Sequence, residues 1–374
     1  MRVLKAHLFV MLDVAVGSPL QPVDKEILQR LKSNGGPAGE AFERLMDSGS
    51  NWIFYGKGYT DEHGSRQRVE VFYGEDMRWP VPRSAGTSGP QAKAAGNSLG
   101  RTRISLHPHF GLGVVTFWKT LIADSAAGEV DALGAKLHAD TRENQYRYHE
   151  ALREWGFSQA RVGRITTVLA VQVDTDNLDG FVSANANAEN IGRLFTGDKE
   201  LERSSKLAAY ATDADVSERR FERIYVRWTD ALAVYDTTTD LMDPASTRVV
   251  RLVETGILMR RLLRETAFEA EKVMSSIRPW TFPWLTGAQK QAEHLRRTMA
   301  EADLTTSVAP PIHSVEGERL LAQTLAAFDV PRLHKDVRHA LSELDRRLEW
   351  QRVRWLAVIA ILAFLANAAI AIWK

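Results

Sequence analysis

The 374-residue chain carries 48 Lys and Arg residues against 47 Asp and Glu residues. Because these charges nearly cancel, no overall field favours binding to nucleic acid or to another polyanion. The chain has no cysteine, which excludes disulfide bonds, cysteine nucleophiles and cysteine-ligated zinc. A chain of this length predicts two folded units ahead of its final apolar segment.

Residues 1–160 predict an N-terminal α+β module. The stretch HLFVMLDVAV (7–16) is rich in apolar and β-branched residues, which favours a buried strand, and two short helices that end in glycine follow it. Residues 80–100 are mostly Pro, Gly, Ser and Ala, which predicts a flexible loop. Further strands are predicted at 51–60, 67–75 and 101–122, and a further helix at about 126–155.

Residues 161–243 predict a second α+β module with a similar order. A strand at 164–175 precedes a helical stretch. Residues 222–237 predict either two more strands or one strand that continues across WTD. The repeated order predicts two duplicated β-α-β-β-α modules whose sheets pair into one core. The alternative is an ordinary α+β domain with similar local order.

The helical region 244–330 follows, and its apolar residues recur at spacings of three and four. Such a narrow seam between charged residues is typical of a helix that packs on other helices. The seam consists of Val249, Leu252, Gly256, Met259, Leu263, Ala267, Ala270, Met274 and Ile277. A stalk helix over 331–354 continues the spacing through Leu333, Val337, Leu341, Leu344 and Leu348, with Pro331 in its first turn.

Residues 355–373 carry no charge. As a helix they measure about 28 Å, enough to cross the hydrocarbon core of a bilayer. Four arginines precede this segment and one lysine follows it, so the positive-inside rule places the N-terminal part in the cytoplasm. The position near the end of the sequence predicts a tail-anchored, single-pass membrane protein, and the richness in alanine and arginine indicates a bacterial inner membrane.

The predicted span favours a homo-oligomer in the lipid bilayer. Asn367 is costly in lipid unless it finds a partner, and the surrounding alanines permit close helix approach. The stalk residues Leu341, Leu344 and Leu348 lead directly into the span, so we expect self-association through stalk and span. Trp280 and Trp284, in the loop RPWTFPWLTG, are expected either to enter a headgroup layer or to pack two helices together.

Two groups of residues are candidate metal ligands. His107 and His109 share one face of a strand, but a third ligand is not identifiable, and a polar strand edge is the alternative. Asp174, Asp176 and Asp179 give DTDNLDG the carboxylate density of a calcium loop. The loop lacks the glycine and the glutamate that such loops need, and an acidic turn is the alternative.

Arg227 and Asp230 flank a tryptophan in YVRWTD and are candidate ligand-binding residues, with a sheet-edge ion pair as the alternative. The sequence contains no Gly-x-Ser-x-Gly, no Walker loop and no His-Glu-x-x-His. No catalytic residue and no cofactor is therefore identified, and the sequence favours a protein that is not an enzyme.

The layout of residues 215–374, an α+β part followed by long helices and a stalk helix that enters the membrane, resembles the CorA family of divalent-cation channels. The resemblance implies an oligomer around a transport path. The family's Gly-Met-Asn signature and second span are absent from this sequence, so no pore residue is carried over. The leading hypothesis is a tail-anchored protein whose cytosolic domain senses a ligand or partner, as in a stress or defence effector. The alternatives are a CorA-like transport component and a membrane-tethered enzyme.

Overall fold

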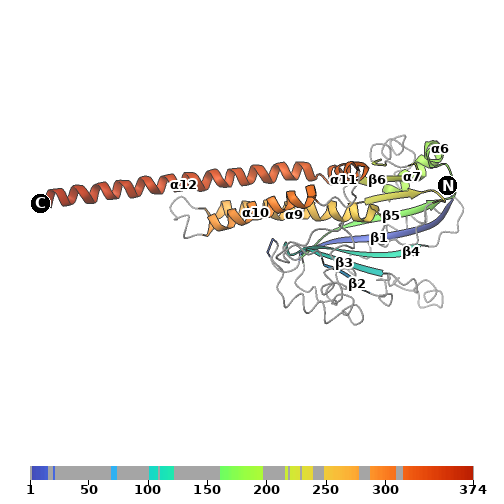
Figure 1. The fold of residues 1–374 in the computed structure, drawn as a ribbon, viewed down its shortest axis with the longest axis horizontal. Coiled ribbons are helices and arrows are strands. Elements are labelled where there is room, and N and C mark those ends of the chain that lie inside the picture. The colour runs from blue at the N-terminus through green and yellow to red at the C-terminus, as the bar shows by residue number, and fades with distance from the viewer. Residues whose placement is uncertain are drawn as a thin grey trace, which may run out of the picture. The chain divides into compact units, whose positions relative to one another are not determined.

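The computed structural model describes twelve stretches of the chain (Figure 1). They are residues 2–15, 20–21, 69–73, 101–107, 110–121, 161–196, 215–217, 220–227, 230–238, 248–277, 287–308 and 315–373. The chain forms two compact units, one of residues 1–261 with 309–329 and the other of 262–308 with 330–374. The predicted helix at 126–155 and the predicted loop at 80–100 lie outside the described residues.

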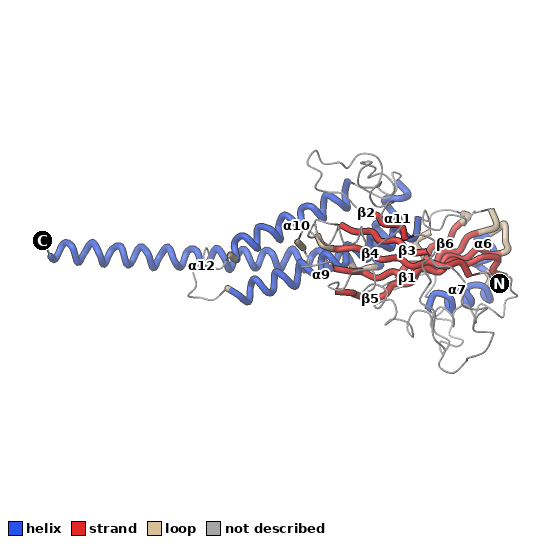
Figure 2. The backbone as a smooth tube through the Cα atoms, turned by 90° about the horizontal axis from the view of Figure 1, so that it is seen from below, coloured by secondary structure: helices blue, strands red, loops and turns tan. Residues whose placement is uncertain are grey.

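A seven-stranded mixed sheet forms the centre of the first unit (Figure 2). Its strand order is β2-β3-β4-β1-β5-β7-β6, and every neighbouring pair is antiparallel except β5 and β7. The strands are β1 (Val3–Ala15), β2 (Val69–Tyr73), β3 (Arg101–His107), β4 (Leu112–Leu121), β5 (Arg161–Val173), β6 (Glu222–Arg227) and β7 (Asp230–Tyr235). The predicted α+β class is confirmed.

Strand β1 lies at the centre of this sheet because its sequence is apolar at successive positions. From Ala6 to Ala15 every side chain is buried, which is expected of a strand covered on both faces rather than on one. It pairs with β4 on one side and with β5 on the other. The buried strand predicted at 7–16 is therefore the centre of the fold.

The strand order of the first half is mirrored in the second half. β4 lies beside β1 with β3 beyond it, and β7 lies beside β5 with β6 beyond it. The directions differ, because β4 runs antiparallel to β1 whereas β7 runs parallel to β5. Parallel neighbours need a crossover connection, and the helices α6 (Leu178–Ser183) and α7 (Asn185–Thr196) follow β5 in the chain.

Helices cover both faces of the sheet. Helix α9 (Arg248–Ser276) reaches one face, where the Thr116 hydroxyl donates a 2.9 Å hydrogen bond to Glu254. On the other face, Asp179 of α6 forms an ion pair with Arg223. Through the paired strands β6, β7 and β5, Arg223 lies in register with Ala6 of β1, whereas Thr116 of β4 is paired with Met11 of β1. Successive side chains along a strand point to opposite faces, so the even-numbered Ala6 and the odd-numbered Met11 face opposite sides of the sheet. In addition, α7 packs against β7, and α11 (Val315–Ala327) packs against β6.

Asp13 is held at an irregularity in the pairing of β1 with β5. The register shifts between Leu12 and Val14, and the Asp13 carboxylate lies over Gly163. A Cβ atom at position 163 would lie 2.1 Å from Asp13 Oδ2. The same oxygen accepts a 3.3 Å contact from Arg261 of α9. The absence of a side chain at Gly163 thus leaves room for an ion pair that fixes α9 on the sheet.

Phe328, at the end of α11, packs directly on Gly256 of α9. A Cβ atom at position 256 would lie 2.6 Å from Phe328 Cδ2, and the Phe328 side chain is 1% exposed. The sequence placed Gly256 in the apolar seam of this helix. The structure adds the reason for glycine there, which is the close approach of an aromatic ring.

Asp215 fixes the short segment that precedes β6. Its carboxylate accepts a 2.8 Å hydrogen bond from the Ser217 amide and another from the Ser217 hydroxyl. The same hydroxyl accepts a 2.7 Å hydrogen bond from the Ile224 amide. Burial raises the pKa of Asp215, and the hydrogen bonds from Ser217 oppose this shift without cancelling it.

The second unit contains the end of α9, then α10 (Ala288–Val308) and α12 (Val330–Trp373). Helix α12 is continuous for 44 residues, which confirms the predicted single helix from the stalk into the apolar segment. α10 packs on α12, and Arg296 forms a 2.7 Å ion pair with Asp345. Buried residues recur at spacings of three and four on both helices: Ala288, Ala292, Leu295 and Met299 on α10, and Val337, Leu341, Leu344, Leu348 and Gln351 on α12.

We predict that Phe328→Ala destabilises the protein by about 3–5 kcal/mol, because it leaves a cavity against Gly256. Phe268→Ala is the matched control, since Phe268 is 56% exposed, and should change stability by no more than about 0.5 kcal/mol. The measurement is guanidinium-induced unfolding of the whole chain in detergent. Equal losses for the two variants would contradict the packing described here.

We also predict that Asp215 makes stability depend on pH. A carboxyl whose pKa is raised on folding binds more protons in the native state than in the unfolded state. The free energy of unfolding therefore falls as the pH rises from the ordinary pKa of 3.8 through the raised pKa of Asp215. Wild type should therefore lose stability relative to Asp215→Asn over this window. Unfolding of both proteins between about pH 3.5 and about pH 7 measures the difference. A difference that stays constant with pH would refute the prediction.

Candidate functional site

Arg227 and Asp230 lie on either side of the connection between β6 and β7 and are cross-strand partners. The Thr167 hydroxyl of β5 donates a hydrogen bond to Asp230. Burial lowers the pKa of the Arg227 guanidinium, and the neighbouring Asp230 offsets part of this shift. The structure thus brings the two predicted residues together as a charged pair at the sheet edge, and their role in ligand binding stays a prediction.

The acidic loop after β5 directs its carboxylates toward arginines. Asp174 forms a 3.3 Å ion pair with Arg2, and Asp179 pairs with Arg223. Asn177 caps helix α6 by accepting a 3.1 Å hydrogen bond from the Gly180 amide. This geometry is that of an acidic turn which starts a helix.

The other predicted metal ligands are only partly described by the structure. Asp176 is exposed in the same turn, and His107 is the last residue of β3. Within the twelve described stretches, no group of three or more His, Cys, Asp or Glu side chains is placed to hold a metal ion. His109, Trp280 and Trp284 lie outside those stretches.

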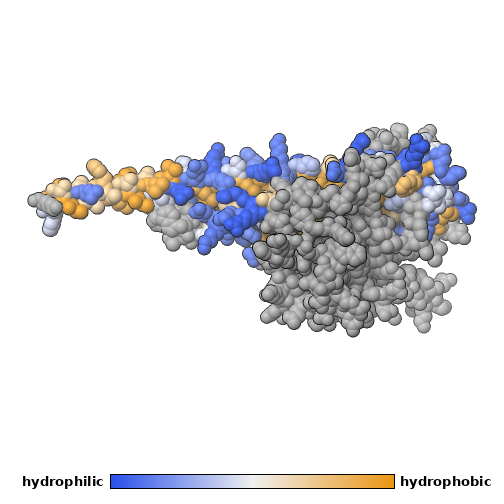
Figure 3. Space-filling view, in the orientation of Figure 1, coloured by the Kyte–Doolittle hydropathy of each residue, from blue (hydrophilic) through white to orange (hydrophobic). Residues whose placement is uncertain are grey.

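The final part of α12 is long and apolar enough to cross a membrane, which agrees with the sequence prediction. Among the residues that the structure describes, no part of its most apolar window is buried. Figures 1 and 3 show this end of α12 extending beyond α9 and α10, with hydrophobic side chains along its length. The predicted residue Asn367 is exposed within it.

The predicted seam residues of α12 have a different environment. Leu341, Leu344 and Leu348 are buried within the single chain. A side chain that is already buried offers little area to a second copy of the protein. Burial of the stalk seam therefore reflects packing inside one chain, and no described residue of α12 after Gln351 is buried.

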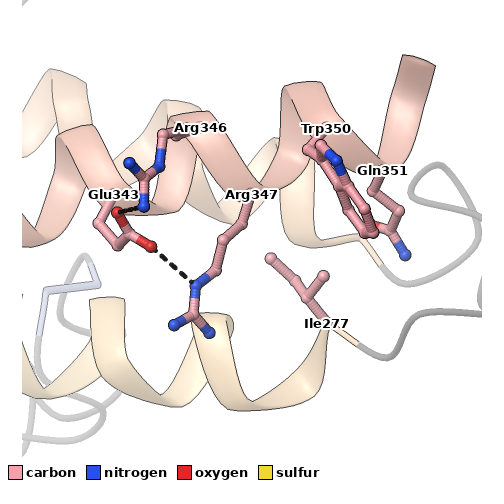
Figure 4. A pocket seen from close by; sticks show the side chains of 6 residues that line it. All are labelled: Ile277, Glu343, Arg346, Arg347, Trp350 and Gln351. Atoms are coloured by element: carbon pink, nitrogen blue, oxygen red, sulfur yellow. Dashed lines mark hydrogen bonds and ion pairs between the residues drawn. The ribbon is translucent and has the colours of Figure 1, made fainter. Parts of the chain in front are cut away.

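A pocket of about 410 Å³ lies just before this exposed segment. It is lined by Ile277, Glu343, Arg346, Arg347, Trp350 and Gln351. Figure 4 shows Ile277 pointing from the end of α9 toward the space between Arg347 and Trp350 of α12. Because Ile277 comes from a different helix, sequence spacing alone did not indicate this pocket.

Two arginines converge on one carboxylate at the pocket. Arg347 Nε lies 3.2 Å from Glu343 Oε1, and Arg346 Nη2 lies 2.9 Å from Glu343 Oε2 (Figure 4). The hydrogen bond from Arg347 holds the pKa of Glu343 below its ordinary value of 4.5, and Arg346 adds to this effect. Glu343 is therefore ionised at neutral pH and orients both guanidinium groups. The two arginines and the one carboxylate together carry a net charge of +1.

Trp350 forms the side of the pocket nearest the apolar segment. Its ring is exposed, and the Arg354 guanidinium carbon lies 5.4 Å from the ring centre, within the range of a cation–π contact. Gln351 is only 2% exposed and also lines the pocket. The pocket thus combines cationic side chains with an aromatic and an aliphatic surface.

No protein-family model, curated protein or solved structure matches the chain. The geometry of α12 and of the pocket beside it therefore carries the functional argument.

Proposed function

We propose that the protein is anchored in a membrane by residues 355–373 of α12. The observation that carries this proposal is that the most apolar window of this helix is not buried among the described residues. Its length of about 28 Å matches the hydrocarbon core of a bilayer. The helix satisfies its own backbone hydrogen bonds, which lipid requires of any spanning segment.

The free energy of the exposed side chains supports the same proposal. Nine large apolar side chains between residues 356 and 373 are exposed: Leu356, Ile359, Ile361, Leu362, Phe364, Leu365, Ile370, Ile372 and Trp373. Burying each stabilises by about 1.5–3 kcal/mol, so their transfer out of water is worth on the order of 10 kcal/mol or more. A bilayer covers all sides of such a helix at once.

Charge supports the proposed orientation. Arg346, Arg347, Arg352 and Arg354 lie on the side of the folded units, and cytoplasmic flanks are enriched in arginine and lysine. This charge bias supports a cytoplasmic location for the folded units. The richness of the sequence in alanine and arginine supports the bacterial inner membrane as the proposed site.

We place self-association in the span rather than in the stalk seam. The exposed Asn367 is costly in lipid unless another span satisfies its amide, and the alanines around it allow close approach. Such an oligomer suits a sensor whose cytosolic part binds a ligand or partner and whose response occurs at the membrane, as in a stress or defence effector.

The alternative proposal, supported by the resemblance in layout to the CorA family, is a component of a cation transporter. Several subunits would then surround a central transport path, and Asn367 of each subunit would face that path. A membrane-tethered enzyme remains a hypothesis without a supporting site.

The mirrored strand order supports a duplicated origin of the two sheet halves, and the differing strand directions oppose it.

We predict that Ala360→Arg/Phe364→Arg releases the protein from membranes. Each arginine near the centre of a span costs about 2.5–3.5 kcal/mol, and both positions are exposed, so the folded units should stay intact. The measurement is the fraction that remains with membranes after alkaline carbonate extraction. Phe268→Arg, the same exchange at an exposed position of α9, is the control and should stay in the membrane. Release of wild type under the same extraction would disprove the anchor.

We predict that Asn367→Leu lowers the number of subunits, because it removes the polar group that favours contact between spans. Mass photometry of the whole chain in nanodiscs counts the subunits. Ile370→Leu, an exchange between apolar residues, is the control and should leave the count unchanged. An unchanged count for Asn367→Leu would remove this residue from the interface.

A further inference from the structure

We infer that the pocket between the end of α9 and α12 binds the headgroup of an anionic phospholipid. The inference rests on the proposed membrane anchoring, because it needs the pocket to lie at the bilayer surface. It goes further by naming a ligand class and the residues that bind it. The depth, the charge and the shape of the pocket each suit such a headgroup.

The depth follows from the continuity of α12. Trp350 precedes Trp355, the first residue of the apolar segment, by five positions, which is about 8 Å along a helix. A headgroup layer is about 5–8 Å thick on each side of the hydrocarbon core. Trp350 therefore lies at the outer boundary of the headgroups. Arg347 and Arg346 precede Trp355 by eight and nine positions, about 12–14 Å along the helix, so their long side chains must reach toward the phosphates of the outer headgroup layer.

The charge of the pocket suits a phosphate diester. An arginine presents several N–H donors in a fork that matches phosphate oxygens. Glu343 engages one nitrogen of Arg346 and one of Arg347. Arg346 is 79% exposed and Arg347 is 53% exposed, so the other nitrogens of both side chains are accessible from solvent.

The walls of the pocket suit the part of a lipid that adjoins the phosphate. Ile277 and the exposed ring of Trp350 give an apolar surface on the side of the apolar segment. Tryptophan is enriched at this level of membrane proteins because its ring is amphipathic. The volume of about 410 Å³ lies within the range of small-molecule sites. A bound phospholipid would thus place its phosphate on the arginines and its glycerol beside Trp350.

The test uses the whole chain in detergent, titrated with phosphatidylglycerol, with phosphatidylcholine of the same acyl chains, and with inorganic phosphate. Native mass spectrometry counts the bound lipids, and a thermal shift reports phosphate. We expect wild type to prefer phosphatidylglycerol. Arg346→Gln/Arg347→Gln should weaken this binding by about tenfold or more and leave binding of phosphatidylcholine unchanged.

Arg332→Gln/Arg338→Gln is the matched control, because it removes the same two charges from exposed positions of the same helix. It should keep the preference. Arg346→Lys/Arg347→Lys keeps the charge without the fork and should restore part of the binding. A change in folding alone would not alter the preference between the two lipids, so this readout separates binding from structure.

Three results would overturn the inference: equal binding of the two lipids by wild type, equal losses in the pocket and control variants, or a response to inorganic phosphate as strong as that to phosphatidylglycerol. Flotation with vesicles of pure phosphatidylcholine separates these failures from failure of the anchor. A protein that floats but shows no preference retains its anchor and lacks the lipid site. A protein that does not float with any vesicle lacks both.

Discussion

Helix α12 must satisfy two environments with one unbroken run of backbone hydrogen bonds. Up to Gln351 its buried side chains recur at spacings of three and four, and α10 packs against it. In the apolar segment from Trp355 to Trp373, apolar side chains lie on all sides of the helix, and no residue is buried among the described parts of the chain. The change from a one-sided to an all-round apolar surface is the change from a helix packed on protein to a helix suited to lipid.

The pocket lies where that change occurs, and this explains its mixed chemistry. Ile277, directly after α9, lines the pocket together with a part of α12 that is still rich in charged residues. Arg346 and Arg347 are then held by Glu343 on their own helix. In the proposed membrane orientation, these side chains would lie where α12 passes from water toward hydrocarbon.

In the first unit, close approaches at glycine keep the helices on the sheet. Gly163 leaves space for the Asp13 carboxylate that reaches Arg261, and Gly256 leaves space for the Phe328 ring. Both contacts join residues that are distant in the sequence. The ion pair between Asp13 and Arg261 and the hydrogen bond between Thr116 and Glu254 bring polar groups into a largely apolar interior. Such groups are tolerated because their partners satisfy them.

The sequence by itself determined the elements whose periodicity is strong and local. The central strand, the two hairpin strands at 222–237, the helical seams and the apolar segment were all predicted, because apolar spacing depends only on neighbouring residues. Only the tertiary structure decided which elements meet. It showed that β7 runs parallel to β5, that Asp174 and Asp179 pair with arginines, that Leu344 is buried within its own chain, and that Ile277 completes a pocket with Arg347. These outcomes depend on contacts between distant parts of the chain, which no local pattern contains.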